Sequence, residues 1–103
     1  MLIEIRRYTL VPGRRDEFVG WFESEVVPAM ARTGMRILGS FESLDDPDVF
    51  VYLRGFVDEA ERSRLTEAFY ESDAWRGGMR ARAMELEVDY EVELVTSTPG
   101  SAI

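Results

Sequence analysis

The sequence predicts an α+β sandwich, in which one antiparallel four-stranded sheet carries helices on a single face. In four separate stretches, apolar residues alternate with polar ones or crowd together, which is typical of strands. After the first and the third stretch, apolar residues recur every three or four positions, which is typical of amphipathic helices. The resulting order is βαββαβ, a ferredoxin-like sandwich, and its second half repeats the β–α unit of the first.

The first strand is predicted over residues 2–10, where apolar and polar residues alternate. Pro12-Gly13 is expected to end this strand in a turn, and a helix is expected from residue 14 to about residue 33. Pro28 is expected to kink this helix near its end, and Gly34 is expected to stop it. The apolar residues of the helix recur every four positions: Phe18, Phe22, Val26 and Met30.

The third and fourth elements are predicted to be a hairpin of strands over residues 35–44 and 49–57, joined by an acidic turn. Asp58 then caps a second helix, and Glu61 three residues later has the spacing of a capping box. The apolar stripe of this helix consists of Leu65 and Phe69.

The last elements are a shorter helical stretch and a closing strand. Ser72-Asp73 is expected to restart a helix, which Gly77-Gly78 weakens by roughly 1 kcal/mol per glycine relative to alanine. Residues 88–96 alternate apolar and acidic side chains, which predicts a half-exposed strand with its acidic face in water. We expect a single domain over residues 1–97 and a disordered tail over residues 98–103.

Composition narrows the classes of function. The formal charge of −8 argues against nucleic acid and anionic membranes as partners, because phosphate binding needs clustered Lys or Arg. No apolar run approaches the ~20 residues of a membrane span, and no signal peptide follows Met1, so a cytoplasmic protein is expected. All 12 basic residues are arginine, which indicates a GC-rich, bacterial genome.

Missing residue types exclude several kinds of chemistry. Without cysteine there are no disulfides and no zinc–sulfur sites. Without histidine the commonest general base and the commonest metal and haem ligand are absent. Without lysine no Schiff base can form. We therefore expect no cofactor and no metal, and a general base has to be a perturbed Glu or Asp, or a tyrosine.

The strand over residues 49–57 is apolar on both faces. Helices on one side of the sheet cover only one of these faces, so the other needs a second layer. A second copy of the chain is the simplest such layer, and we expect a homodimer. The two faces are Val49, Val51 and Leu53 on one side, and Phe50, Tyr52 and Phe56 on the other.

Residues 4–13, Glu-Ile-Arg-Arg-Tyr-Thr-Leu-Val-Pro-Gly, resemble the opening Glu-x-Arg-x-Tyr-x-Leu-x-Pro-Gly of the NIPSNAP family in the dimeric α+β barrel superfamily. The resemblance continues through Phe18, Phe22 and Val27-Pro28, and through Tyr-Glu-Ser-Asp-Ala-Trp at residues 70–75. It implies that two sheets pack face to face across a dimer. In related barrel families, small molecules bind between each sheet and its own helices, and the resemblance implies a site at the same place.

The resemblance implies no particular reaction, since the family has none that is generally established. Some relatives in the superfamily are cofactor-free monooxygenases or isomerases, and others bind haem through histidine. Because this chain has no histidine, neither the haem-type site nor a histidine-based monooxygenase site carries over.

Two strand faces hold the best candidates for a ligand site. Glu4, Arg6 and Tyr8 share a face of the first strand, and Tyr52 and Arg54 share a face of the third. They form either an aromatic pocket with two guanidinium groups or a structural ion pair in which an arginine neutralises Glu4. The ligand-binding candidates are Glu4, Arg6, Tyr8, Tyr52, Arg54 and, beside the flexible Gly77-Gly78, Trp75.

Other conspicuous side chains have simpler interpretations. Helical spacing favours a core role for Trp21, Phe69 and Tyr70, and charge patterning favours solvated surface for the Arg62/Arg64 and Arg80/Arg82 pairs.

Two hypotheses on function remain. In the first, the protein binds a small anionic or carbonyl-bearing molecule between sheet and helices, and a cofactor-independent oxygenase or isomerase is one form of this. In the second, it is a non-catalytic dimeric module for protein association or sequestration.

Overall fold

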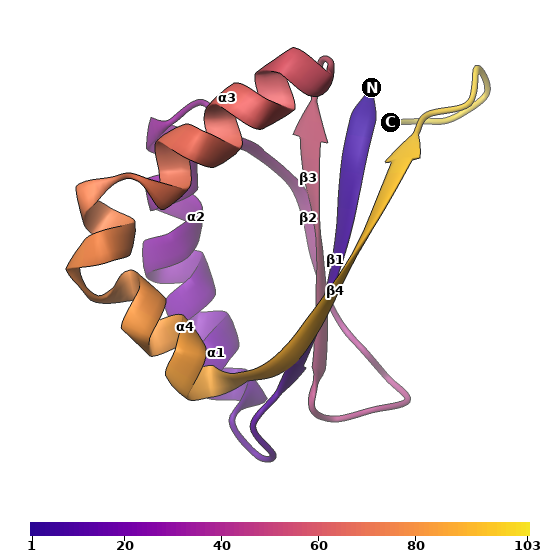
Figure 1. Ribbon diagram of the computed structural model, residues 1–103. Helices are drawn as coiled ribbons and strands as arrows, with labels where there is room; N and C mark the ends of the chain where they lie inside the picture. Colours follow the sequence, from indigo (N-terminus) through magenta and orange to yellow (C-terminus); the bar gives the residue numbers. More distant parts are fainter.

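A four-stranded antiparallel sheet forms one layer and the helices form the other in the computed structural model, which describes residues 1–103 (Figure 1). The strands lie in the order β2-β3-β1-β4, so β1 and β3 are the central neighbours. All helices lie on one side of the sheet. The predicted ferredoxin-like fold class is therefore confirmed. The strands are β1 (Leu2–Leu10), β2 (Arg36–Glu42), β3 (Val49–Phe56) and β4 (Glu87–Thr96).

The helix predicted over residues 14–33 contains a π-helical turn ahead of Pro28. The Val27 N–H bonds to the Phe22 carbonyl five residues earlier, where an α-helix uses the carbonyl four residues earlier. Pro28 has no N–H to donate, so the regular hydrogen-bond ladder is interrupted at this point. The segments are α1 (Arg15–Trp21), η1 (Phe22–Val26) and α2 (Val27–Arg32).

The second helical region follows the sequence-based expectation closely. The Glu61 N–H donates to Asp58 Oδ1 at 2.8 Å, and the Val57 N–H donates to Glu61 Oε1 at 3.0 Å, which confirms the predicted cap. Gly78 has φ +134°, a conformation that favours glycine, and it interrupts the shorter helix, which the sequence predicted the two glycines only to weaken. The segments are α3 (Glu59–Tyr70), η2 (Trp75–Met79) and α4 (Arg80–Leu86).

Strand register decides which side chains share the space under the helices. Glu4 lies opposite Arg54, and Arg6 lies opposite Tyr52 in the antiparallel β1–β3 pair. Because paired residues point to the same face, both candidate sets point to one side of the sheet. All of these side chains are buried, so that side is the one covered by the helices.

The edge strand β4 differs from its prediction. Its apolar residues lie on the helix side, since Tyr90 pairs with Tyr8 and Val92 pairs with Arg6, yet both remain exposed. Its acidic residues share the opposite, helix-free face with Arg7, the partner of Glu91. The acidic face is exposed as predicted, but the strand is not half-exposed, because the helices leave the apolar face of this edge open as well.

The two ends of the chain lie side by side (Figure 1). The Ser97 N–H donates to the Met1 carbonyl at 3.1 Å, and the Ser101 N–H donates to the Thr98 carbonyl in a turn. The disorder expected for residues 98–103 stays a prediction. None of the helices combines the length and the apolar character that crossing a membrane requires.

Candidate functional site

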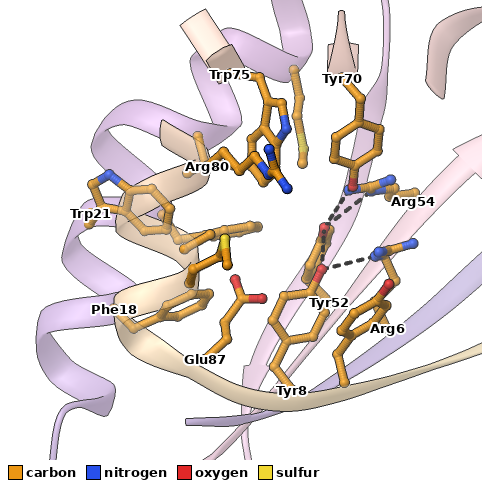
Figure 2. Close-up of a pocket in the computed structure, with 16 residues that line it drawn as sticks. Arg6, Tyr8, Phe18, Trp21, Tyr52, Arg54, Tyr70, Trp75, Arg80 and Glu87 are labelled. Carbon is orange, nitrogen blue, oxygen red and sulfur yellow. Dashed lines mark hydrogen bonds between the residues drawn. The ribbon is translucent and has the colours of Figure 1, made fainter. Parts of the chain in front are cut away.

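A cavity of about 370 Å³ opens between the sheet and the helices (Figure 2). Its size falls in the range of small-molecule sites in proteins. β1, β3 and β4 form its floor, and the helical segments on either side form its walls. The cavity therefore lies where the resemblance implied a ligand site.

The cavity floor is a chain of phenol and guanidinium groups. Arg6 Nε donates to the Tyr8 hydroxyl at 3.1 Å, and this hydroxyl lies 3.3 Å from that of Tyr52. Arg54 Nη2 donates to the Tyr52 hydroxyl at 2.8 Å and to the Tyr70 hydroxyl at 2.7 Å (Figure 2). Burial raises the pKa of the Tyr8 phenol, so Tyr8 stays protonated and serves as a hydrogen-bond donor.

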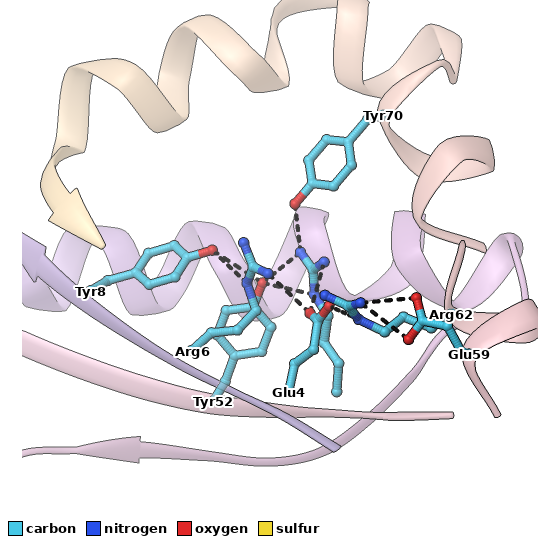
Figure 3. Close-up of polar contacts among 8 residues, drawn as sticks. Glu4, Arg6, Tyr8, Tyr52, Glu59, Arg62 and Tyr70 are labelled. Atoms are coloured by element: carbon cyan, nitrogen blue, oxygen red, sulfur yellow. Dashed lines mark hydrogen bonds and ion pairs between the residues drawn. The ribbon is translucent and has the colours of Figure 1, made fainter. Parts of the chain in front are cut away.

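Glu4 lies behind this floor and is shared by three arginines (Figure 3). Arg6 Nη1 donates to Glu4 Oε1 at 2.9 Å, Arg62 Nε donates to Oε2 at 2.7 Å, and Arg54 Nη1 lies 3.5 Å from Oε1. Burial alone raises the pKa of Glu4, but the Arg62 hydrogen bond and the charges of Arg54 and Arg6 outweigh it, so the pKa is lowered. Glu4 is therefore a structural anion.

The two interpretations offered by the sequence hold together. Arg6 and Arg54 neutralise Glu4, and the same two guanidinium groups line the cavity. Arg6 uses Nε and Nη1 in its internal contacts, which leaves Nη2 without a partner in the protein. Arg62 is part of this network, so the expectation that it is solvated surface was wrong.

The walls of the cavity are aromatic. Phe22 packs against Tyr52 with ring centroids 4.7 Å apart, and Trp75 meets Tyr70 edge-on at 5.0 Å. Trp21 also lines the cavity. The core role predicted for Trp21 and Tyr70 is thus incomplete, because each packs in the core and also faces the cavity.

The sequence-based analysis did not propose Arg80, Glu87 or Tyr90 as site residues, although all three line the cavity. Arg80 is exposed, as expected, and it also lies at the cavity (Figure 2). Tyr90 holds its ring centroid 5.5 Å from the Arg6 guanidinium.

Glu87 lies at the junction of α4 and β4, where a register shift between Thr9 and Leu10 pairs Leu10 with Glu87. Without this irregularity, Glu87 shares the outward side of Asp89 and Glu91, so alternation along the sequence hides it. Burial raises the pKa of Glu87 to about 7, although the charges of Arg6 and Arg54 oppose the shift.

The structure thus brings together five of the six sequence-derived candidates around one cavity: Arg6, Tyr8, Tyr52, Arg54 and Trp75. Glu4 lies behind Arg6 and Arg54. Such a set can hold a small molecule through apolar and aromatic contacts and can donate several hydrogen bonds to a negatively charged or carbonyl oxygen.

The sequence matches the NIPSNAP family over residues 3–101. No curated protein has a matching sequence. The fold is similar to an uncharacterized NIPSNAP domain protein from Burkholderia xenovorans, with a TM-score of 0.91, 17% sequence identity, and all of both chains covered.

Two further solved structures have a similar fold. One is a NIPSNAP family protein with unknown function from Agrobacterium tumefaciens, with a TM-score of 0.90 and 19% identity over 99% of this chain and 92% of that one. The other is an antibiotic biosynthesis monooxygenase, with a TM-score of 0.69 and 19% identity over 96% of this chain and 100% of that one. At these identities the likeness concerns the fold alone.

Proposed function

The chain belongs to the NIPSNAP family, and from this premise and its cavity we propose that it binds a small anionic or carbonyl-bearing molecule between sheet and helices. The observation that carries the proposal is an excess of guanidinium groups. Three arginines share the carboxylate of Glu4, and only Arg62 has a second partner, the exposed Glu59. Arg80, which also lines the cavity, adds a further positive charge.

A negative ligand group compensates this excess. In a partly buried site, charge-assisted hydrogen bonds from guanidinium to carboxylate are roughly twice as strong as neutral ones. The Tyr8 hydroxyl and the free Nη2 of Arg6 are hydrogen-bond donors of two residues that line the cavity. The aromatic walls favour a ligand that also has an apolar, ring-sized part.

We expect phenylacetate to bind and its uncharged analogue phenylacetamide to bind at least tenfold more weakly. A hydrogen bond to a charged group contributes about 1.5–3 kcal/mol, and 1.4 kcal/mol is a factor of ten. The two tryptophans of the chain, Trp21 and Trp75, both line the cavity, so intrinsic fluorescence reports binding directly. Arg80→Met should weaken phenylacetate binding by roughly 1.5- to 5-fold, because it removes one exposed charge.

Arg76→Met is the matched control, since Arg76 is exposed on η2 and does not line the cavity. It should leave the affinity unchanged. Equal affinity for phenylacetate and phenylacetamide, or equal weakening by both variants, contradicts an anion site in the cavity. Absence of any binding favours the alternative function, a non-catalytic module for association or sequestration.

We also propose that the chain forms a homodimer through the helix-free face of the sheet, in the cytoplasm expected from the sequence. Ile5, Val51 and Leu53 meet on this face without helices over them. Arg7 and Glu91 lie opposite each other there, so a two-fold arrangement can place unlike charges against each other. Burial of this face between two copies removes apolar surface from water.

Phe41→Glu should convert the dimer to a monomer in sedimentation experiments at micromolar concentration. Phe41 pairs with Val51 on the helix-free face and is 51% exposed in the single chain, so a carboxylate there opposes apolar packing without disturbing the core. Leu44→Glu is the control, because Leu44 lies fully exposed in the β2–β3 turn. A monomeric wild-type protein, or dimers of equal stability in both variants, contradicts the proposed interface.

A further inference from the structure

We propose that Glu87 is the catalytic acid–base group of the cavity and transfers a proton to and from the carbon next to the carbonyl group of a small anionic carbonyl compound. The inference rests on the ligand binding proposed above and adds a reaction to it. The reaction class is enolisation, which interconverts keto and enol forms or isomerises a neighbouring double bond.

The position of Glu87 is the first support. Its carboxyl group points into the cavity beside Phe18 and Tyr8 (Figure 2). Glu87 forms none of the ion pairs that hold the other carboxylates packed near the cavity, whereas Glu4 is engaged by three arginines. A carboxyl group that is free of such partners can accept a proton from a ligand and return it.

The surroundings of Glu87 are the second support. The titratable and charged groups around the cavity are Arg6 and Tyr8 from β1, Tyr52 and Arg54 from β3, Tyr70 from α3, Arg80 from α4 and Tyr90 from β4; α1 and η1 contribute only apolar side chains. Glu87 is thus the one carboxyl group among them. Its pKa of about 7, which burial raises against the pull of Arg6 and Arg54, leaves both protonation states populated near neutral pH.

The floor of the cavity is the third support, because it supplies what an enolate needs. The carboxylate of Glu87 takes a proton from the α-carbon, the C–H electron pair forms a C=C bond, and the carbonyl π pair moves onto oxygen. The resulting negative oxygen accepts hydrogen bonds from the guanidinium and phenol donors of Arg6 and Tyr8. Return of the proton from Glu87 to carbon or oxygen completes the step, so atoms and electrons balance without an oxidant or a cofactor.

Phenylpyruvate is a suitable probe, because it combines a ring, a carboxylate and an acidic C–H bond beside a ketone. We expect the wild-type protein to accelerate exchange of the C3 protons for deuterium in D₂O, followed by NMR, at least tenfold over buffer alone. Glu87→Gln should exchange at close to the rate in buffer, because a general base usually contributes a factor of about 10²–10⁴ and its loss removes the whole acceleration. Calorimetry should give phenylpyruvate affinities for the two proteins within about threefold of each other.

Two further variants separate chemistry from structure. Glu67→Gln changes an exposed carboxylate on α3 that does not line the cavity, and it should exchange like the wild type. Glu87→Asp keeps a carboxylate and should restore part of the rate. The wild-type rate should rise with pH through about 7, because the carboxylate is the active form.

Binding of phenylpyruvate without accelerated exchange overturns the proton transfer and leaves the binding proposal intact. Exchange by Glu87→Gln at the wild-type rate also overturns it. Failure of phenylpyruvate to bind overturns both the inference and the ligand class on which it rests.

Discussion

Glu4→Gln is expected to lower the free energy of unfolding by about 3–5 kcal/mol, the cost of removing one partner from a buried ionic network. The side chain of Glu4 is 2% exposed and compensates Arg6, Arg54 and Arg62. Glutamine has a similar shape but no charge, so three guanidinium groups are left without their common counter-ion. Urea unfolding at neutral pH and fixed protein concentration measures the loss.

Glu59→Gln is the control for this experiment. Glu59 pairs with Arg62 as well, but it is exposed, so its removal should cost less than about 1 kcal/mol. A loss of similar size in both variants would show that Glu4 acts as an ordinary surface ion pair.

The same network predicts a dependence on pH. The pKa of Glu4 is lowered below its ordinary value of 4.5, so the folded protein holds this proton less readily than the unfolded chain. The contribution of Glu4 to stability is therefore complete above about pH 4.5 and is lost as the pH falls through the lowered pKa of the folded state. The Glu4→Gln variant has no such contribution to lose.

Glu87→Gln is expected to change stability in the opposite direction, raising the free energy of unfolding by roughly 1–2 kcal/mol at pH 8. The pKa of Glu87 is raised from 4.5 to about 7, so the folded protein retains a proton that the unfolded chain releases between these values. Stability of the wild type therefore falls as the pH rises from about 4.5 to 7. The full shift would correspond to more, but Glu87 is only partly buried and solvent screens its charge.

Urea unfolding at pH 4 and at pH 8 tests this expectation. The two proteins should be nearly equally stable at pH 4, where Glu87 is protonated in the folded protein and in most of the unfolded chains, and should differ at pH 8. Glu67→Gln, at an exposed position of α3 away from the cavity, should show no such gain. If Glu87→Gln has the same pH profile as the wild type, the carboxyl group is solvated and its place in the cavity carries no electrostatic cost.

The carboxylates of Glu4 and Glu87 differ in how the neighbouring arginines affect their charge. Glu4 is held as an anion by three arginines and stabilises the fold. Glu87 lies in the same cavity region without such partners, and its burial destabilises the charged form. A group that costs stability where a ligand binds is typical of functional sites, where activity and stability often conflict.

Local patterns in the sequence were sufficient to predict the helices and strands of the fold. Alternation predicted the strands, four-residue recurrence predicted the helices, and the Asp58–Glu61 spacing predicted a cap that the structure confirms. Pro28 marked an irregular region correctly, but the irregularity is a π-helical turn just ahead of it. These features depend on neighbours within a few residues, which is why a sequence reveals them.

Only part of the candidate site could be predicted from such local patterns. Arg6, Tyr8, Tyr52 and Arg54 were found because alternation places them on two strand faces. Glu87 was missed because the irregular pairing near Leu10 reverses its side. Arg80 was missed because helical charge patterning does not show which turn of α4 borders a cavity.

By itself the sequence determined the two-layer architecture and the side chains available for binding or catalysis. These are arginine, tyrosine and carboxylates, because histidine, cysteine and lysine are absent. Only the tertiary structure decided that Arg6 and Arg54 both neutralise Glu4 and line a cavity, and that Glu87 lines it with them. The physical reason is that burial, charge compensation and pKa depend on residues brought together by strand register and helix packing, which no local pattern contains.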